Sequence, residues 1–280
     1  MTDRLSVKKT YKLFIGGAFP RSESGRTMVV TSPEGAVLAH VAKASRKDLR
    51  EAVRAARAAQ QSWSDRAPYN RGQILYRVAE ILEGRSAQLR SELEAVGYSA
   101  DNARADVETA IDGAIYWAGF ADKLDHLVGG VNPVAGPFLN LSHAIPLGVC
   151  ALAAPDDGGI RGLLGLIAPA IMAGNSVVAI AGGRSALVTS TLGEVFATSD
   201  VPAGVVNLLT GDHRSLLPWA ADHDDIDLMD LSGAPVDVVA DLEARAAQNL
   251  KRVARTDGTE DINTARAFSE IKTIWHPARI

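Results

Sequence analysis

The single thiol of this 280-residue sequence, Cys150, is the one residue that could serve as a cysteine nucleophile. It lies in the apolar segment LGVCALAA, residues 147–154, which has the composition of a buried strand. A cysteine becomes strongly nucleophilic when a nearby cation stabilises its thiolate, and this segment contains no cationic residue. The sequence therefore favours a small buried hydrophobic residue at this position over a catalytic one.

Carboxylates are concentrated in two places that could support acid–base or metal chemistry. Asp156 and Asp157 could act as a general acid–base pair, but the sequence places no histidine or further acid beside them. Segment 221–230, ADHDDIDLMD, carries oxygen ligands suited to a hard cation, although a solvated loop before a strand is the simpler explanation. No G-x-S-x-G nucleophile elbow is present. We therefore predict no catalytic residue and no metal ligand.

These residues have to be positioned by elements that the sequence pattern predicts. Turn signals at Gly16-Gly17 and at 33–35 predict two hairpins in the first 45 residues. Four helices follow, the first starting at a capping box of Ser45 and Asp48 and the last covering 107–124. Residues 128–137 are expected to form a loop or a hairpin tip. Apolar strands then alternate with helices, which is typical of an α/β protein with a doubly wound, mostly parallel sheet.

Composition restricts the class of protein. Hydrophobic residues make up 47% of the sequence and charged residues 22%, enough for a large core. The formal net charge is -4 without a basic block, which argues against nucleic acid or an anionic membrane as the main partner. A single cysteine excludes an internal disulfide. The N-terminus has no apolar signal segment and the most apolar stretch, 160–174, is too short to span a bilayer, so we expect a cytoplasmic protein.

Several stretches jointly resemble the aldehyde dehydrogenase superfamily. They are LFIGGAFPRSESGRT, YWAGFADKL, IPLGVCALAAP, APAIMAGNSVV, VPAGVVNLLTG and SEIKTIW, which together extend over about 12–275. The resemblance implies an NAD(P)-dependent enzyme of three parts: a Rossmann-like coenzyme-binding domain, a catalytic domain with a cysteine nucleophile, and a small β flap for oligomerisation.

In this sequence the resemblance implies that the catalytic domain is absent. The implied parts are an N-terminal part of the coenzyme-binding-like domain at 1–125, a flap hairpin at 126–147, the Rossmann-like part at 148–255, and a linker with the C-terminal flap strand at 256–280. Where the family continues from the strand LKRV into its catalytic domain, this sequence passes through a polar tether into SEIKTIW. The chain is similar to the truncated, cysteine-less second module of the two-module aldehyde dehydrogenases.

Positions that match functional residues of the family carry different chemistry. Asp157 stands where the resemblance places an oxyanion-binding asparagine, and Thr256 where it places a general-base glutamate. Ile180 replaces a lysine that holds the adenine ribose. We therefore expect no bound cofactor. If NAD(P) were bound, the resemblance implies contacts at the helix N-terminus after the fourth strand and at one nearby arginine. These vestigial candidates are Ser232, Gly233 and Arg184.

The retained flap is the feature that points to a function. In the family, the flap strand of one subunit adds to the catalytic-domain sheet of its neighbour, and two copies of this chain cannot complete each other in that way. The resemblance therefore implies a heteromer in which this chain is a pseudoenzyme subunit that supports a full-length aldehyde dehydrogenase. The predicted partner interface consists of Phe138, Leu139, Leu141, Phe268, Ile271, Lys272, Thr273, Ile274 and Trp275.

Two alternatives to that heteromer stay open from the sequence. The chain could be an NAD(P)-binding oxidoreductase fragment that completes an active site in trans, which predicts measurable coenzyme binding. It could also be a homodimeric scaffold that uses the long helix at 107–124, which predicts a dimer of the chain alone.

Overall fold

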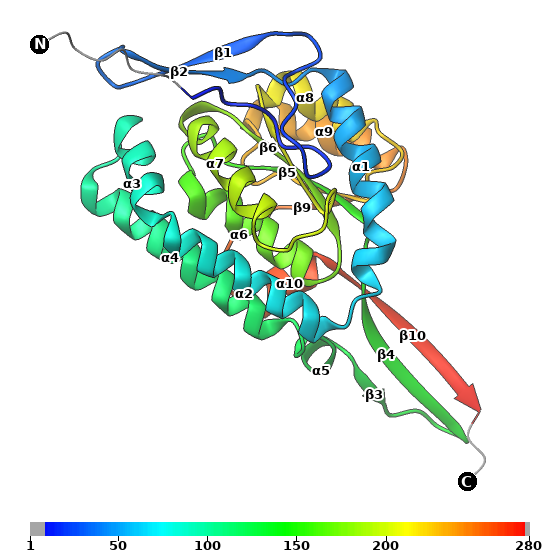
Figure 1. The fold of residues 1–280 in the computed structure, drawn as a ribbon. Helices are drawn as coiled ribbons and strands as arrows, with labels where there is room; N and C mark the ends of the chain where they lie inside the picture. Colours follow the sequence, from blue (N-terminus) through cyan, green and yellow to red (C-terminus); the bar gives the residue numbers. More distant parts are fainter. Residues whose placement is uncertain (1–8, 278–280) are drawn as a thin grey trace, which may run out of the picture.

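The computed structural model describes residues 9–277, and a five-stranded sheet lies at its centre (Figure 1). The strands are β5 (Val149–Ala153), β6 (Ser176–Ala181), β7 (Val206–Thr210), β8 (Leu228–Asp230) and β9 (Arg252–Ala254). They lie in the order β7-β6-β5-β8-β9 and all pair in parallel. The chain runs outward from β5 to β7 and then returns to place β8 on the other side of β5. This is the predicted doubly wound sheet of a Rossmann-like α/β protein.

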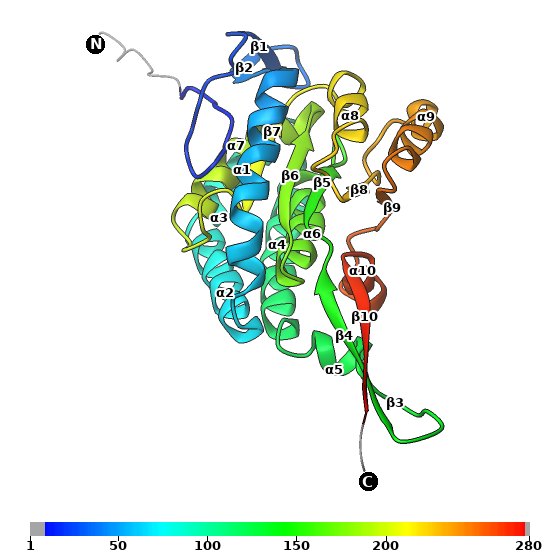
Figure 2. The same cartoon turned by 90° about the vertical axis from the view of Figure 1, so that its right-hand side faces the viewer.

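Helices cover both faces of this sheet, as Figure 2 shows from the side. One face is covered by α6 (Gly159–Met172) and α7 (Ala186–Ala197), with α2 (Pro68–Gly84), α3 (Ser86–Ala95) and α4 (Ala100–Phe120) outside them. The other face is covered by α1 (Arg46–Ser64), α8 (His213–Ala221) and α9 (Val236–Ala247). Because both faces are buried, the central strands β5, β6 and β7 are mostly apolar. Within 9–277, no helix has the length and hydropathy needed to cross a membrane.

The N-terminal region contains both predicted hairpins. Around Gly16-Gly17, Ile15 and Ala18 exchange two backbone hydrogen bonds of 3.0 Å, and Leu13 N donates to Pro20 O at 3.1 Å. Phe14 also pairs with Leu208 of β7 and is buried against the main sheet. The second hairpin is confirmed as β1 (Thr27–Thr31) and β2 (Val37–Ala42), and α1 begins at the predicted capping box.

A separate antiparallel sheet projects from the body as an arm, which we call the flap (Figure 1 and Figure 2). Its strands are β3 (Gly130–Asn132), β4 (Phe138–Pro146) and β10 (Ser269–Pro277), in the order β10-β4-β3. β10 pairs with β4 along its whole length. The short helix α5 (Leu124–Val128) leads into the flap, and β3 lies within the segment predicted to be a loop or hairpin tip. Between β9 and β10 the chain has only residues 255–268, which include α10 (Ile262–Ala267).

One buried amide fastens the C-terminal segment to the body. Asn175 Oδ1 accepts hydrogen bonds from Leu147 N at 2.7 Å and Gly148 N at 2.9 Å, at the start of β5. Its Nδ2 donates to Ala170 O at 2.9 Å and to Phe268 O at 2.8 Å. The Phe268 ring is fully buried in the core beside it. The residue that precedes β10 is therefore fixed to both α6 and the main sheet.

We expect Asn175→Ala to lower the free energy of unfolding by about 3 kcal/mol, because the buried N–H groups of Leu147 and Gly148 lose their acceptor. Urea unfolding of the purified protein measures this change. Asn102→Ala, an exposed position on α4 whose side chain has no hydrogen bond in the described structure, is the matched control and should change it little. Equal effects of the two substitutions would contradict the anchoring role of Asn175.

Candidate functional site

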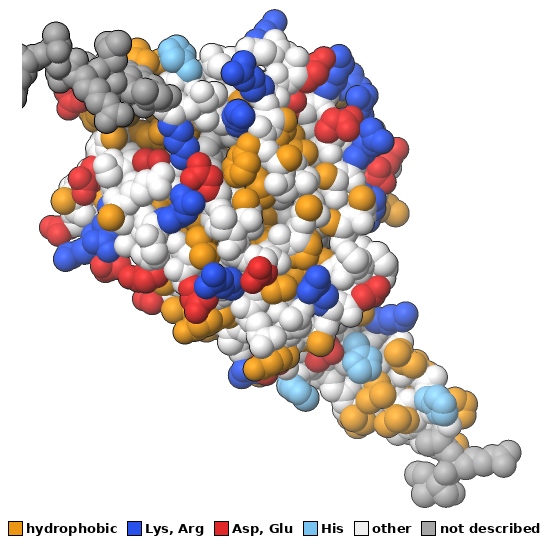
Figure 3. Space-filling model, in the orientation of Figure 1, with side chains coloured by type: hydrophobic (Ala, Val, Ile, Leu, Met, Phe, Trp, Pro, Cys, Tyr) orange, Lys and Arg blue, Asp and Glu red, His pale blue; other side chains and the backbone are white. Residues whose placement is uncertain are grey.

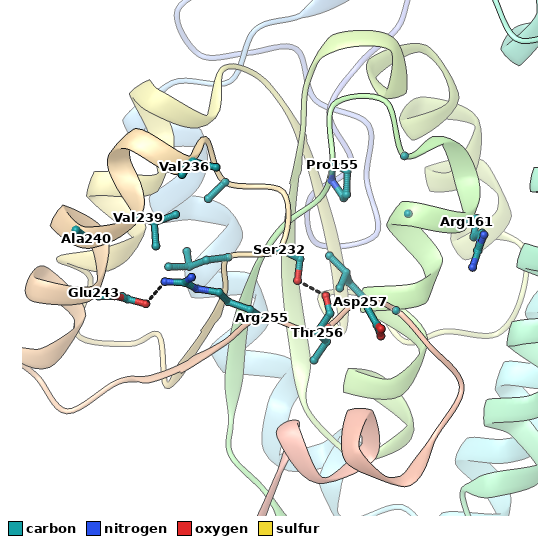
Figure 4. A pocket seen from close by; sticks show the side chains of 16 residues that line it. Pro155, Arg161, Ser232, Val236, Val239, Ala240, Glu243, Arg255, Thr256 and Asp257 are labelled. Atoms are coloured by element: carbon teal, nitrogen blue, oxygen red, sulfur yellow. Dashed lines mark hydrogen bonds and ion pairs between the residues drawn. The ribbon is translucent and has the colours of Figure 1, made fainter.

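The carboxyl ends of β5 and β8 border a crevice, because the chain changes direction across the sheet between these strands. A cavity of about 770 Å³ opens there. In Figure 4, Val239 and Glu243 of α9 lie on one side of it and Arg161 on the other, with Ser232 and Thr256 between them. Open α/β sheets bind ligands at this edge, so the predicted coenzyme residues have to be assessed here.

The turn after β8 has no spare donor for an anion. Its three successive backbone N–H groups all donate within the protein: Ser232 N to Asp230 Oδ1 at 2.9 Å, Gly233 N to Ala153 O at 2.9 Å and Ala234 N to Leu231 O at 3.0 Å. A Cβ at Gly233 would collide with the backbone of Ala154, so this glycine permits close packing against the end of β5. The turn at which the resemblance implies coenzyme contacts therefore joins the end of β8 to the end of β5.

Asp230 is the acceptor that joins this turn to the segment after β9. Its carboxylate is fully buried and accepts from the hydroxyl of Ser232 as well as from its N–H. It also accepts from Thr256 N at 3.1 Å and Thr256 Oγ1 at 2.8 Å. Thr256, where the resemblance implies a general base in the family, therefore makes a structural hydrogen bond.

A second carboxylate occupies the N-terminus of α6. Asp106 Oδ1, from α4, accepts from Ile160 N at 2.9 Å and from Arg161 N at 3.3 Å. Burial raises the pKa of Asp106, and these two N–H groups partly offset that rise. Gly159 N donates to Ser185 Oγ at 3.2 Å. The first turn of this helix, the other natural anion site of the crevice, is thus filled by the protein itself.

Arg184 does not line the cavity. Its guanidinium lies 3.6 Å from the Asp157 carboxylate, measured from Nη2 to Oδ2, and 5.2 Å from the centre of the Tyr98 ring. The neighbouring Asp156 carboxylate lies against Gly182, with one oxygen 3.3 Å from the buried His213 Nδ1. Of the three coenzyme candidates only Ser232 lines the cavity, so the structure does not bring them together.

The remaining chemistry-bearing residues are engaged in the core or in ion pairs. Burial raises the pKa of the Cys150 thiol well above its ordinary range, and the nearby Asp227 adds to the rise. Ile180 is fully buried in the core. In the acidic segment, Asp227 Oδ2 lies 2.6 Å from Arg57 Nη2. Among residues 9–277, no three His, Cys, Asp or Glu side chains are grouped to hold a metal ion.

The flap brings most of the predicted interface residues onto one arm, where apolar side chains gather (Figure 3). Val131, Leu141 and Ile274 stand directly opposite one another and form an apolar row across all three strands. At the tip, the rings of Phe138 and Trp275 meet edge to face with centroids 5.9 Å apart. Val131, Ile274, Phe138 and Trp275 are exposed, so the flap presents apolar side chains to solvent on both of its faces.

The opposite face of the flap, which also carries Ile271, Trp275 and Phe138, has a polar row at its centre. Asn132 Nδ2 donates to Ser142 Oγ at 2.7 Å, and Ser142 Oγ lies 3.0 Å from Thr273 Oγ1. Phe268, predicted to belong to the interface, is instead fully buried and precedes the strand, because its ring completes the core beside Asn175. Phe268 therefore anchors the flap and is not available to a partner.

Several residues with structural roles in the flap and the crevice were not predicted from the sequence. Val131 lies in a strand of three residues, too short to show an alternating pattern. Asp106 and Asn175 act on residues 54 and 93 positions away, at Ile160 and Phe268. The signal for Asn175 was its polarity inside the apolar stretch APAIMAGNSVV, since a buried amide requires partners.

The chain matches the family model described as "Aldehyde dehydrogenase family" over residues 19–264. It is 31% identical over 257 residues to an aldehyde dehydrogenase, cytosolic 1, from Elephantulus edwardii, covering 89% of this chain and 50% of that protein. It is 32% identical over 256 residues to an aldehyde dehydrogenase from Aspergillus niger, covering 90% and 50%. The chain thus spans about half the length of these curated relatives.

The chain also covers about half the length of the solved structures that it matches. The crystal structure of PnpE from Pseudomonas sp. WBC-3 matches with a TM-score of 0.81 and 28% identity, covering 88% of this chain and 50% of that one. A PnpE structure in complex with nicotinamide adenine dinucleotide matches with a TM-score of 0.80 at the same identity and coverage.

The raised pKa of Asp106 predicts a pH dependence of stability. Its folded-state pKa lies above the ordinary value of 3.8, so the stability contributed by its protonated form is complete below that value and is lost as pH rises through the raised pKa. We therefore expect wild type to lose stability relative to Asp106→Asn as pH rises through this window in urea unfolding. Asp112→Asn, exposed on the same helix, is the control. A pH-independent difference between wild type and Asp106→Asn would contradict the assignment.

Proposed function

The chain belongs to the aldehyde dehydrogenase family, and we propose that it is a non-catalytic subunit that pairs with a full-length aldehyde dehydrogenase through its flap. The observation that carries this proposal is β10, an exposed strand of nine residues that is rigidly anchored at its root and bonded along only one edge in the described structure. Such an edge binds an extended segment of a partner by backbone hydrogen bonds.

The residues of the crevice support the non-catalytic part of the proposal. The one thiol of the sequence is buried with a raised pKa, which suppresses the thiolate that acts as nucleophile. A dinucleotide pyrophosphate requires unpaired N–H donors, whereas the turn after β8 and the start of α6 donate to the protein's own oxygens. The residues present therefore do not fit NAD(P), and we derive no hydride-transfer chemistry for this chain.

The partner is inferred from the surface that the flap exposes. Its apolar row, made of Val131, Leu141 and Ile274, needs an apolar counterpart, and the β10 edge needs a strand. We infer that both are supplied by the longer relatives, because this chain matches only about half of their length. An aldehyde dehydrogenase with its second half present would offer the sheet that this chain does not contain.

Mixing the chain with a full-length aldehyde dehydrogenase from the same source should give a mixed complex in sedimentation velocity. Ile274→Asp should weaken it at least about tenfold, because a carboxylate would be desolvated in the apolar row. The matched control is Val236→Asp on α9, also exposed but far from the flap, which should leave the affinity unchanged. Absence of a mixed complex with wild type would reject the proposal.

The alternative, an NAD(P)-binding fragment acting in trans, is favoured by the cavity at the sheet switch point. A coenzyme that binds must stabilise the fold by mass action, by about 2.7 kcal/mol at a concentration one hundred times its Kd. We expect millimolar NAD+ or NADP+ to leave the Tm of the purified chain unchanged, since the anion-binding donors are occupied. A saturable rise in Tm would support the alternative instead.

A further inference from the structure

We propose that the β10 edge also pairs with the β10 edge of a second copy, so that the chain without its partner forms a two-fold dimer with a six-stranded flap sheet. The edge is available because, in the part of the chain that the structure describes, β4 is the only strand that pairs with β10. The flap projects from the body, so antiparallel pairing places the two bodies at opposite ends of the joined sheet (Figure 1).

Symmetry restricts how two such edges can meet. A two-fold axis perpendicular to the sheet makes the two β10 strands antiparallel and keeps each residue opposite a residue of the same face. Thr273 is the central residue of β10, Ser269–Pro277. Pairing of the whole strand therefore places Thr273 directly opposite its own copy.

In this register the side chains that meet are compatible. Ile271 and Trp275, which are 40% and 59% exposed, stand opposite each other and can bury apolar surface. Glu270 stands opposite His276, and Lys272 opposite Ile274, so no like charges meet. The next register in one direction places Lys272 opposite its own copy, and the next in the other direction leaves Ser269 and Glu270 without a counterpart in β10. Like charges opposite one another destabilise a sheet, so the Thr273-centred register is favoured.

The ends of the strand also suit this register. Pro277, which has no N–H, comes to lie opposite Ser269. The Ser269 carbonyl already accepts a hydrogen bond from Arg252 Nη1 at 2.6 Å. The Ser269 carbonyl would face Pro277, which has no N–H to donate. Because that carbonyl is already bonded to Arg252, the end of the ladder leaves no acceptor without a partner.

This dimer concerns the same edge as the proposed heteromer, but it does not require that heteromer to exist. If both form, the full-length enzyme must displace the second copy, and the amount of free partner sets which complex is present. Self-pairing would also cover an edge that is otherwise an aggregation hazard.

Thr273→Cys tests the register directly, because the natural Cys150 is fully buried. Opposed residues in an antiparallel pair have Cα atoms about 4.5–5.5 Å apart, within the range that a disulfide spans. We expect mild oxidation to convert most of Thr273→Cys into a covalent dimer. Ile271→Cys is the matched control, since its two copies would lie about 13 Å apart along the strand and should remain mostly uncrosslinked.

A charge exchange provides a second, independent variant. Ile271→Glu alone should shift the chain toward monomer in sedimentation equilibrium, and adding Trp275→Lys should restore the dimer, because each Glu would face a Lys of the other copy. A wild-type chain that stays monomeric, or equal crosslinking of both cysteine variants, would overturn the dimer. A monomer that still binds a full-length aldehyde dehydrogenase would overturn only this inference and leave the subunit proposal standing.

Discussion

Backbone hydrogen bonding at the β10 edge is the constraint on which the rest of this structure depends. The inner edge of β10 is bonded to β4 along all nine residues, and its root is fixed by Asn175 and the buried Phe268. The strand is therefore preorganised, and little conformational entropy remains to be lost when a partner strand is added. The outer edge and the apolar row beside it lower their free energy only when another strand covers them. This asymmetry is the basis for the proposal that the flap binds a partner.

The crevice has the opposite character, because its polar groups are satisfied internally. Asp230 and Asp106 accept from the backbone N–H groups that a phosphate would otherwise use, and Asp156 lies across the glycine turn after β6. These carboxylates also make the strand ends unfavourable for a second anion. The chain therefore keeps the sheet edge at which such folds bind ligands. The backbone N–H groups at this edge, however, are hydrogen-bonded within the protein and stabilise it. We infer that a chain whose crevice donors are occupied and whose flap edge is open is better suited to assembly than to catalysis.

The fold was largely predictable from the sequence, and the site only in part. Alternating strands and helices, the capping box at Ser45 and the doubly wound sheet follow from local periodicity, which short-range physics determines. The failures involve contacts between distant segments. Phe268 was predicted to lie at the partner interface, but its ring completes the core beside Asn175. The sequence marked Ser232 and Gly233 as coenzyme residues, since it could not reveal that Asp230 and Ala153 occupy their N–H groups.

The central claim is that this chain functions by binding an aldehyde dehydrogenase through its flap. The most direct measurement is the structure of the complex isolated from the source cells through a tag on this chain. The account predicts a full-length aldehyde dehydrogenase whose sheet continues into β10, with the crevice between β5 and β8 containing no coenzyme. A complex that contacts the chain only at the crevice, or one without any aldehyde dehydrogenase, would contradict it.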